Sequence, residues 1–242
     1  MLPVFGLNKY VYTELPSDAY RGYNTPGIGI PGSWPGSGAA PIPATARLPI
    51  ISIRPDVATF NSGTLDTPLR SFAMTIPVGS VITLWAEGDG ARFGFKPADI
   101  VAMHQRAYDL IKGQQSECLY AQIVEGYTAR HGSLAPYVME YADLYLIDGY
   151  PESTADTPAE VFDPAHSVVS PYGPVGITET NSMGAAGKLP DNPIWYAQAW
   201  HYAKAYGYTT FMAYGGPTVV LTSADVAALT SIKRESEAGI LL

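Results

Sequence analysis

The sequence predicts an α/β fold, a compact (β/α)8 barrel of the TIM type formed by one domain over residues 1–242. Apolar runs rich in Ile, Val and Leu recur along the chain, and segments with helical spacing separate them, which favours parallel strands with right-handed crossovers. The length of 242 residues suits such a barrel, which typically needs about 250. A doubly wound open sheet is the alternative, but no Gly-x-Gly-x-x-Gly turn follows the first apolar run.

The first strands flank an irregular N-terminal segment. Val4 to Asn8 is a short apolar run, and residues 9–49 are then rich in Gly and Pro, which prevents a long helix. That segment has room for one short strand, near residues 20–23 or 28–30. The run from Arg47 to Asp56 is bounded by prolines and rich in Ile, which predicts the next strand.

Helices are expected on both sides of the following strand, Ser80 to Glu87. Leu65 to Met74 has helical spacing, and Pro97 begins a longer apolar stripe that ends before Gly113. His104 lies on that stripe, where a hydrogen-bonded core histidine is expected rather than a ligand.

The second half of the chain repeats the alternation. Runs rich in β-branched and aromatic residues predict strands at 118–124, 142–151, 174–179 and 208–216. Helical patterns predict a short helix over Leu134 to Tyr141, a helix start at 157–162, a helix from Pro193 to Tyr206 capped by Asn192, and a closing amphipathic helix capped by Ser223.

The composition narrows the choice of partners. Twenty-two acidic and fourteen basic residues give a formal charge of -8, which argues against nucleic acid or an anionic membrane surface. No apolar run reaches the ~18 residues that a membrane span needs, and no signal peptide is visible, so we expect a soluble protein, cytoplasmic or virion-associated. With Cys118 as the single cysteine, no paired histidines and no phosphate-binding loop, no metal or cofactor is expected.

Two of the expected strands end in glutamate, at Glu87 and Glu179. In a barrel these strands are the fourth and the seventh, and their carboxyl ends face each other across the mouth. Glycosidic bond cleavage needs such a pair, because one carboxyl group protonates the leaving oxygen while the other attacks the anomeric carbon, at a separation of about 5–5.5 Å in retaining enzymes.

Four segments resemble strands of clan A glycoside hydrolases. Asp143-Leu-Tyr-Leu-Ile-Asp-Gly-Tyr-Pro151, Pro174-Val-Gly-Ile-Thr-Glu-Thr180 and Phe211-Met-Ala-Tyr214 are similar to their sixth, seventh and eighth strands, and Leu84-Trp-Ala-Glu-Gly-Asp89 to their fourth-strand motif. The likeness covers most of residues 48–216 and is closest to the β-mannanase-like family twenty-six and its uncharacterised actinobacterial and phage relatives. It implies a retaining hydrolase acting on a poly- or oligosaccharide, with Glu87 as acid/base and Glu179 as nucleophile.

The chain departs from that family in two places. Ala86 stands where the family usually has His, and Gly88 stands where Pro often follows the acid/base. The Gly/Pro-rich segment replaces the first helices and offers a surface for assembly into a larger particle. These departures favour an alternative from another class: a catalytically weak or inactive barrel that binds carbohydrate or serves as a structural component, for example in a phage tail contacting a bacterial envelope.

Further residues at strand ends are candidates for substrate binding. Asp148 and Tyr150 can hydrogen-bond a sugar or orient Glu179, although an aspartate at a strand end also caps turns. Glu125 and Tyr127 end the fifth strand, where a tyrosine can hold the nucleophile.

Three other candidates each have a structural alternative. Arg54 can steady a carboxylate in the mouth or form a structural ion pair. Trp85 shares a pleat face with Glu87 and so lines the cleft floor, unless it packs in the barrel wall. Tyr214, at the end of the last strand, offers a stacking platform for a sugar ring, and a neutral carbohydrate is the expected partner.

Overall fold

Parallel strands form the centre of the molecule in the computed structural model, which describes residues 4–8, 19–23, 48–74, 76–185, 187–214 and 221–240. They pair in sequence order, and the sheet closes into a barrel because β1 pairs with both β2 and β8. The strands are β1 (Val4–Asn8), β2 (Ala19–Tyr23), β3 (Leu48–Ile53), β4 (Val81–Leu84), β5 (Leu119–Glu125), β6 (Leu144–Asp148), β7 (Val175–Glu179) and β8 (Thr210–Ala213).

The predicted strand order is confirmed, including the fourth and seventh places of the two strands that lead to Glu87 and Glu179. The short strand expected within the Gly/Pro-rich segment lies at the first of its two expected positions, as β2. The rest of the Gly/Pro-rich segment, including residues 28–30, lies outside the described residues, apart from the start of β3.

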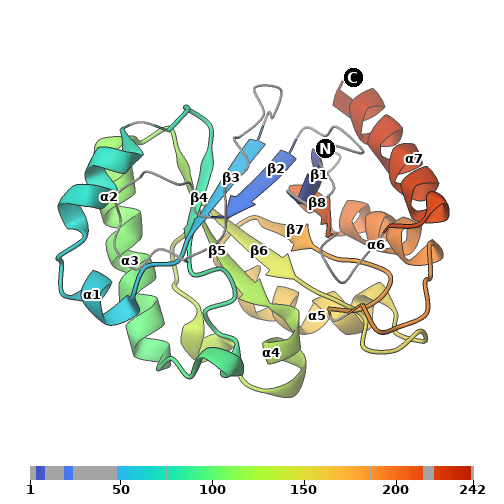
Figure 1. Ribbon diagram of the computed structural model, residues 1–242, viewed down its shortest axis with the longest axis horizontal. Coiled ribbons are helices and arrows are strands. Elements are labelled where there is room, and N and C mark those ends of the chain that lie inside the picture. Colours follow the sequence, from blue (N-terminus) through green and yellow to red (C-terminus); the bar gives the residue numbers. More distant parts are fainter. Residues whose placement is uncertain are drawn as a thin grey trace.

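Helices follow each strand from β3 onward within the described part of the chain. They are α1 (Val57–Asn61), α2 (Asp66–Ala73), α3 (Pro97–Gln114), α4 (Gly126–His131), α5 (Pro158–Val169), α6 (Ile194–Ala205) and α7 (Ser223–Ile240), with 3-10 turns η1 (Ala91–Phe93) and η2 (Ala135–Tyr137). In Figure 1, α1 to α3 lie together on one side of the strands, and α6 and α7 lie together on the other. Among the described helices, none combines the length and apolar content that crossing a bilayer requires.

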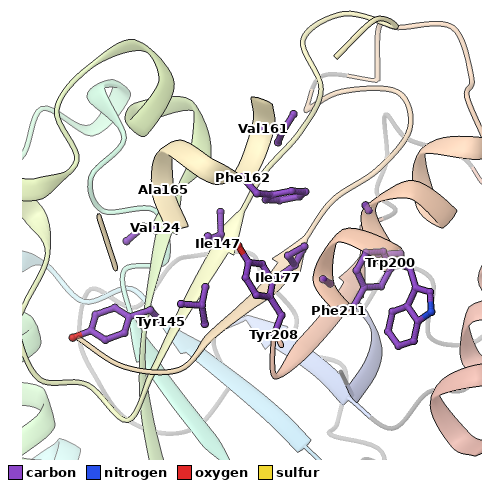
Figure 2. Close-up of a cluster of buried hydrophobic side chains, with 14 of the residues drawn as sticks. Val124, Tyr145, Ile147, Val161, Phe162, Ala165, Ile177, Trp200, Tyr208 and Phe211 are labelled. Atoms are coloured by element: carbon purple, nitrogen blue, oxygen red, sulfur yellow. The ribbon is translucent and has the colours of Figure 1, made fainter. Parts of the chain in front are cut away.

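Alternating side chains build separate cores inside and outside the sheet. Ile123 and Leu146 point to the barrel interior, whereas their neighbours Val124 and Ile147 pack against the outer helices. On that outer face, Figure 2 shows rings from β8 and the helices filling the space, with Trp200 edge-on to Phe211 at 5.6 Å between centroids. A second outer core joins β3, β4 and β5 to α1, α2 and α3. These cores fix the strands whose ends carry the polar residues.

The prediction of a helix over Leu134 to Tyr141 is wrong. Only the 3-10 turn η2 forms, and the chain is extended again at Val138. Gln122 of β5 explains this, because its side-chain amide donates to Tyr137 O at 2.7 Å and accepts from Met139 N at 3.0 Å. A strand side chain therefore takes the backbone groups that a helix would have paired internally.

Helix caps also differ from expectation. Pro193, not Asn192, precedes the first residue of α6, and no side chain caps that helix. Thr222 rather than Ser223 caps α7, since Asp225 N donates to Thr222 Oγ1 at 3.2 Å while Thr222 N donates to Asp225 Oδ2 at 2.8 Å.

The long helix α3 continues through Gly113 to Gln114, beyond its predicted end. The expectation for His104 on this helix is confirmed. Its ring is buried, lies 2.7 Å from Tyr120 Oη through Nδ1, and has a pKa lowered to about 3 by burial.

Two glycine substitutions should change stability in opposite directions. A Cβ at Gly176 in β7 would overlap Thr210 Oγ1 and lie 3.0 Å from Leu146 Cδ2, so Gly176→Ala should lower the free energy of unfolding by about 1–3 kcal/mol. A Cβ at Gly113 in α3 meets no atom within 4 Å, so Gly113→Ala should raise it by about 0.5–1 kcal/mol. Urea denaturation measures both, and a shift of both midpoints in the same direction would contradict the packing described.

Candidate active site

The register of three neighbouring strands aligns acidic residues at their carboxyl ends. Glu125 of β5 pairs with Asp148 of β6, and Asp148 pairs with Glu179 of β7. Glu87 lies beside them because its backbone N–H donates to Ile123 O of β5 at 3.0 Å, which extends the pairing beyond β4. The fold therefore gathers four carboxyl groups at the mouth, where barrel enzymes carry their active sites.

The backbone after β4 leaves the extended conformation before it reaches Glu87. Trp85 and Glu87 have φ of 44° and 61°, in the left-handed region that non-glycine residues rarely adopt. The pleat argument that placed Trp85 on the cleft floor therefore fails. Its ring packs against Phe93 and Phe95, and its Nε1 donates to Pro55 O, so packing is the role that its position supports.

Ala86 and Arg54 contact each other beside the backbone of Trp85 and Glu87. Ala86, where the family resemblance implies histidine, is fully buried in the core inside the barrel. Arg54 follows β3 and donates from Nη2 to Ala86 O at 3.2 Å, and the same nitrogen lies 3.9 Å from Glu87 Oε2. Arg54 thus reaches the Glu87 carboxylate, as its position at a strand end suggested.

Glu179 is almost fully buried and is hydrogen-bonded to Tyr150. The carboxylate residue is 5% exposed, and the Tyr150 hydroxyl donates to its Oε2. Burial, followed by the charges of Glu179, Asp148 and Glu87, raises the pKa of Tyr150 well above its usual value, so the hydroxyl keeps its proton and remains a donor. Tyr214 packs edge-on to Tyr150 with ring centroids 5.9 Å apart.

Asp148 is fully buried between these groups. Its Oδ1 accepts a hydrogen bond from the Thr178 hydroxyl of β7 at 2.5 Å. This bond ties β6 to β7 directly below Glu179, so Asp148 supports the site from within the barrel.

Arg92 is a site residue that the sequence interpretation missed. It lies in η1, five residues after Glu87, and its guanidinium donates from Nη2 to Glu87 Oε2 at 2.6 Å and from Nη1 to Glu125 Oε1. Glu125 also accepts from the Thr128 hydroxyl at 3.1 Å. A single arginine in the Gly-rich stretch after the fourth strand was the available signal, but sequence spacing alone does not reveal its two partners.

Tyr127 lies apart from Glu179, so the expectation that it holds the nucleophile gives way to the Tyr150 contact. Tyr127 lies in the first turn of α4 and is 56% exposed. Its ring packs against His131 with ring centroids 4.4 Å apart. It instead borders a cavity of about 280 Å³ at the mouth, lined by Arg92, Glu125, Tyr127, Asp148, Tyr150, Pro151, Glu152 and Ala185. Neither Glu87 nor Glu179 is among these lining residues, but Arg92, which donates to Glu87, and Tyr150, which donates to Glu179, both are.

Asp89 is a further buried acid near the mouth. Both of its carboxylate oxygens lie 3.1 Å from the backbone N of Glu125, which donates to them. Burial, with a smaller contribution from the charge of Glu125, raises the pKa of Asp89 to about 7 against the opposing effect of that hydrogen bond. The loop after β4 is thus joined to the end of β5 through a carboxyl group that titrates near neutrality.

Asp89→Asn should flatten the pH dependence of stability between about pH 4 and pH 7. Because the folded-state pKa is raised above the value of 3.8, the folded protein binds this proton more tightly. That stabilisation is complete below the unfolded pKa and is lost as the pH rises through the folded pKa. Asparagine still accepts the Glu125 N–H but has no proton to lose.

Urea unfolding of both proteins at about pH 5 and about pH 8 measures this effect. The wild type should lose more stability than the variant between the two conditions. Parallel losses would mean that Asp89 is already ionised in the folded protein at the lower pH.

Comparisons with known proteins address the fold. No family profile and no curated protein matches the sequence. Among solved structures, the catalytic domain of Thermobifida fusca endoglucanase Cel5A (E5) superposes with a TM-score of 0.63 at 9% identity, over 96% of this chain and 92% of that chain. A glucosidase from Croceicoccus marinus gives 0.63 at 10% identity, over 98% of this chain and 68% of that one.

A third structure is the exo-β-1,4-mannosidase Op5Man5 from Opitutaceae bacterium strain TAV5, with a TM-score of 0.61 at 14% identity, over 99% of this chain and 60% of the mannosidase. These neighbours are glycoside hydrolases, whereas membership of this chain in that clan, in family twenty-six or among its phage relatives remains a prediction. At such low identities the likeness establishes the α/β barrel fold that this chain shares with them, and leaves its chemistry to the side chains.

Proposed function

We propose that the chain is a retaining glycoside hydrolase that acts on a poly- or oligosaccharide, with Glu87 as acid/base and Glu179 as nucleophile. The proposal includes one (β/α)8 domain spanning residues 1–242. The observation that carries it is the set of contacts at the mouth, in which Tyr150 donates to Glu179 and Arg92, which lines the same cavity as Tyr150, donates to Glu87. The end of β7 and the loop after β4 thus each bring a carboxyl group to residues that line one cavity.

The environment of each carboxyl group supports its role. A nucleophile must be fixed in position, and the Tyr150 hydroxyl orients Glu179 by donating to its Oε2. Glu87 lies on the loop after β4 and its side chain is 13% exposed, so it can exchange protons with the leaving group and with water.

The reaction then proceeds in two displacements. Glu179 attacks the anomeric carbon while Glu87 gives its proton to the glycosidic oxygen, and the bond between carbon and that oxygen breaks. Glu87, now ionised, takes a proton from water, whose oxygen attacks the same carbon and releases Glu179. The anomeric configuration is inverted twice and so is retained.

A neutral sugar fits the surroundings of the pair. Tyr127 and Tyr150 present ring surface to the cavity, and the carboxylates of Glu125 and Glu152 offer acceptors for hydroxyl groups. Tyr214, packed on Tyr150, extends the aromatic surface. The names of the structural neighbours suggest β-linked gluco- and manno-oligosaccharides as the first substrates to examine.

Glu87→Gln and Glu179→Gln should each lower kcat/KM on such oligosaccharides by about 10²–10⁴-fold or more, because each removes one partner of the proton transfer or of the covalent step. Hydrolysis rates and the NMR configuration of the first-formed product measure the effect. Glu237→Gln, which removes an exposed carboxylate on α7, is the control and should keep full activity.

Inverted product would overturn the retaining mechanism. Binding of oligosaccharides without turnover by the wild type, unaffected by either site substitution, would overturn the hydrolase and leave the binding or structural alternative.

Tyr150→Phe should reduce kcat about 10–100-fold, because it removes a hydrogen bond to a charged group, which is worth about 1.5–3 kcal/mol. The matched control is Tyr145→Phe, which removes a hydroxyl that donates to Met139 O at 2.7 Å on the outer face of the barrel. Steady-state kinetics should show loss in the first variant only. Equal loss in both would assign the effect to general destabilisation.

A further inference from the structure

One guanidinium bridges two of the carboxylates at the mouth. Arg92 donates to Glu87 through Nη2 and to Glu125 through Nη1, so it joins the end of β4 to the end of β5. Its side chain is 50% exposed, which leaves room for it to move as the cavity fills. Before any sugar binds, the carboxylate of Glu87, the proposed acid/base, is therefore paired with Arg92.

The local structure holds Arg92 in this place. Its guanidinium lies 4.7 Å from the Phe93 ring centroid, and Phe93 packs on Trp85 and Phe95 at 5.1 Å and 5.8 Å. Gly90 permits the close approach of the loop, because a Cβ there would lie 2.9 Å from Glu125 Oε2. The contact of Arg92 with the two carboxylates is thus supported by an aromatic cluster and by Gly90, whereas an isolated surface ion pair has no such support.

The two carboxylates differ in how firmly they are held. Glu125 also accepts from the Thr128 hydroxyl, and its backbone N–H donates to Asp89. Glu87 has one further cation nearby, with Arg54 Nη2 at 3.9 Å. Glu125 belongs to β5 and Glu87 to the loop after β4, so we take Glu125 as the fixed end of the bridge and Glu87 as the end that is released.

This bridge opposes the first chemical step and favours the second. A guanidinium favours the ionised form of the carboxylate it contacts, whereas proton donation to a leaving group needs the protonated form. Water activation in the second step needs the ionised form. The charged and titratable groups that face Arg92 are Glu87, Asp89 and Glu125, with Arg54, Asp148, Tyr150 and Glu152 around the same mouth.

We infer that Arg92 is a positioning residue that divides its contacts between Glu87 and Glu125, and that sugar binding in the cavity moves it onto Glu125 alone. This inference rests on the proposed function, and it assigns Glu125 a role as the resting partner of Arg92. Released from Arg92, Glu87 takes a proton from solvent and gives it to the glycosidic oxygen. Arg92 then returns as Glu87 becomes ionised and accepts the proton of the attacking water.

Two substitutions should move the alkaline limb of the pH profile of kcat/KM in opposite directions. Arg92→Met keeps the apolar stem but removes the charge, so the limb should move up by about one pH unit. Glu125→Gln leaves Glu87 as the single ionised partner of Arg92, so the limb should move down and kcat should fall. The control is Arg106→Met, which removes a two-bond pair with Asp66 between α3 and α2 and should not move the limb.

A second readout does not depend on turnover. In protein labelled with 13C at the glutamate carboxyl carbons, the signal lost in Glu87→Gln identifies Glu87, and it should titrate at higher pH in Arg92→Met than in the wild type. Thermal melts confirm that each variant is folded.

The outcomes separate this inference from the proposed function. Unchanged titration of Glu87, or limbs that move in the same direction in both variants, overturns the role of Arg92 in an enzyme that still hydrolyses sugar. A wild type that hydrolyses no glycoside overturns the proposed function, and the catalytic use of Arg92 falls with it.

Discussion

The pairing of β5, β6 and β7 at their carboxyl ends, with a register shift between Ile147 and Asp148, sets the central constraint of this molecule. It places Glu125, Asp148 and Glu179 side by side at one edge of a closed sheet, largely removed from water. Neighbouring carboxylates at low exposure repel one another and lose hydration, so the row needs donors to persist. The rest of the mouth is arranged around that need.

Each acid in the row has its own donor, and each donor comes from a different element. Tyr150 serves Glu179 from the end of β6, Thr178 serves Asp148 from β7, and Thr128 and Arg92 serve Glu125 from α4 and the β4 loop. Because these donors belong to separate elements of the fold, the outer cores that fix the positions of those elements also fix the hydrogen bonds. Packing far from the mouth thus sets the electrostatics within it.

The sequence was sufficient for the order of the strands and for the acids at their ends, because β-branched runs ending in polar residues are local signals. It was insufficient where a distant side chain decides the outcome. Gln122 converts the expected helix at 134–141 into a turn, and the backbone at Trp85 is left-handed where an extended strand was expected, with its ring packed on Phe93 and Phe95. The partners of Arg92 were likewise hidden, since they depend on a three-dimensional approach that Gly90 permits.

The left-handed backbone at Trp85 and Glu87 carries a cost that glycine would largely avoid, typically about 1–3 kcal/mol for each such residue. The chain has tryptophan and glutamate at these positions, which lowers its free energy of unfolding but places the Glu87 carboxylate at the mouth. Selection for heat resistance alone would be expected to replace Glu87 early. A thermostable descendant obtained in that way would retain the barrel and lose the acid.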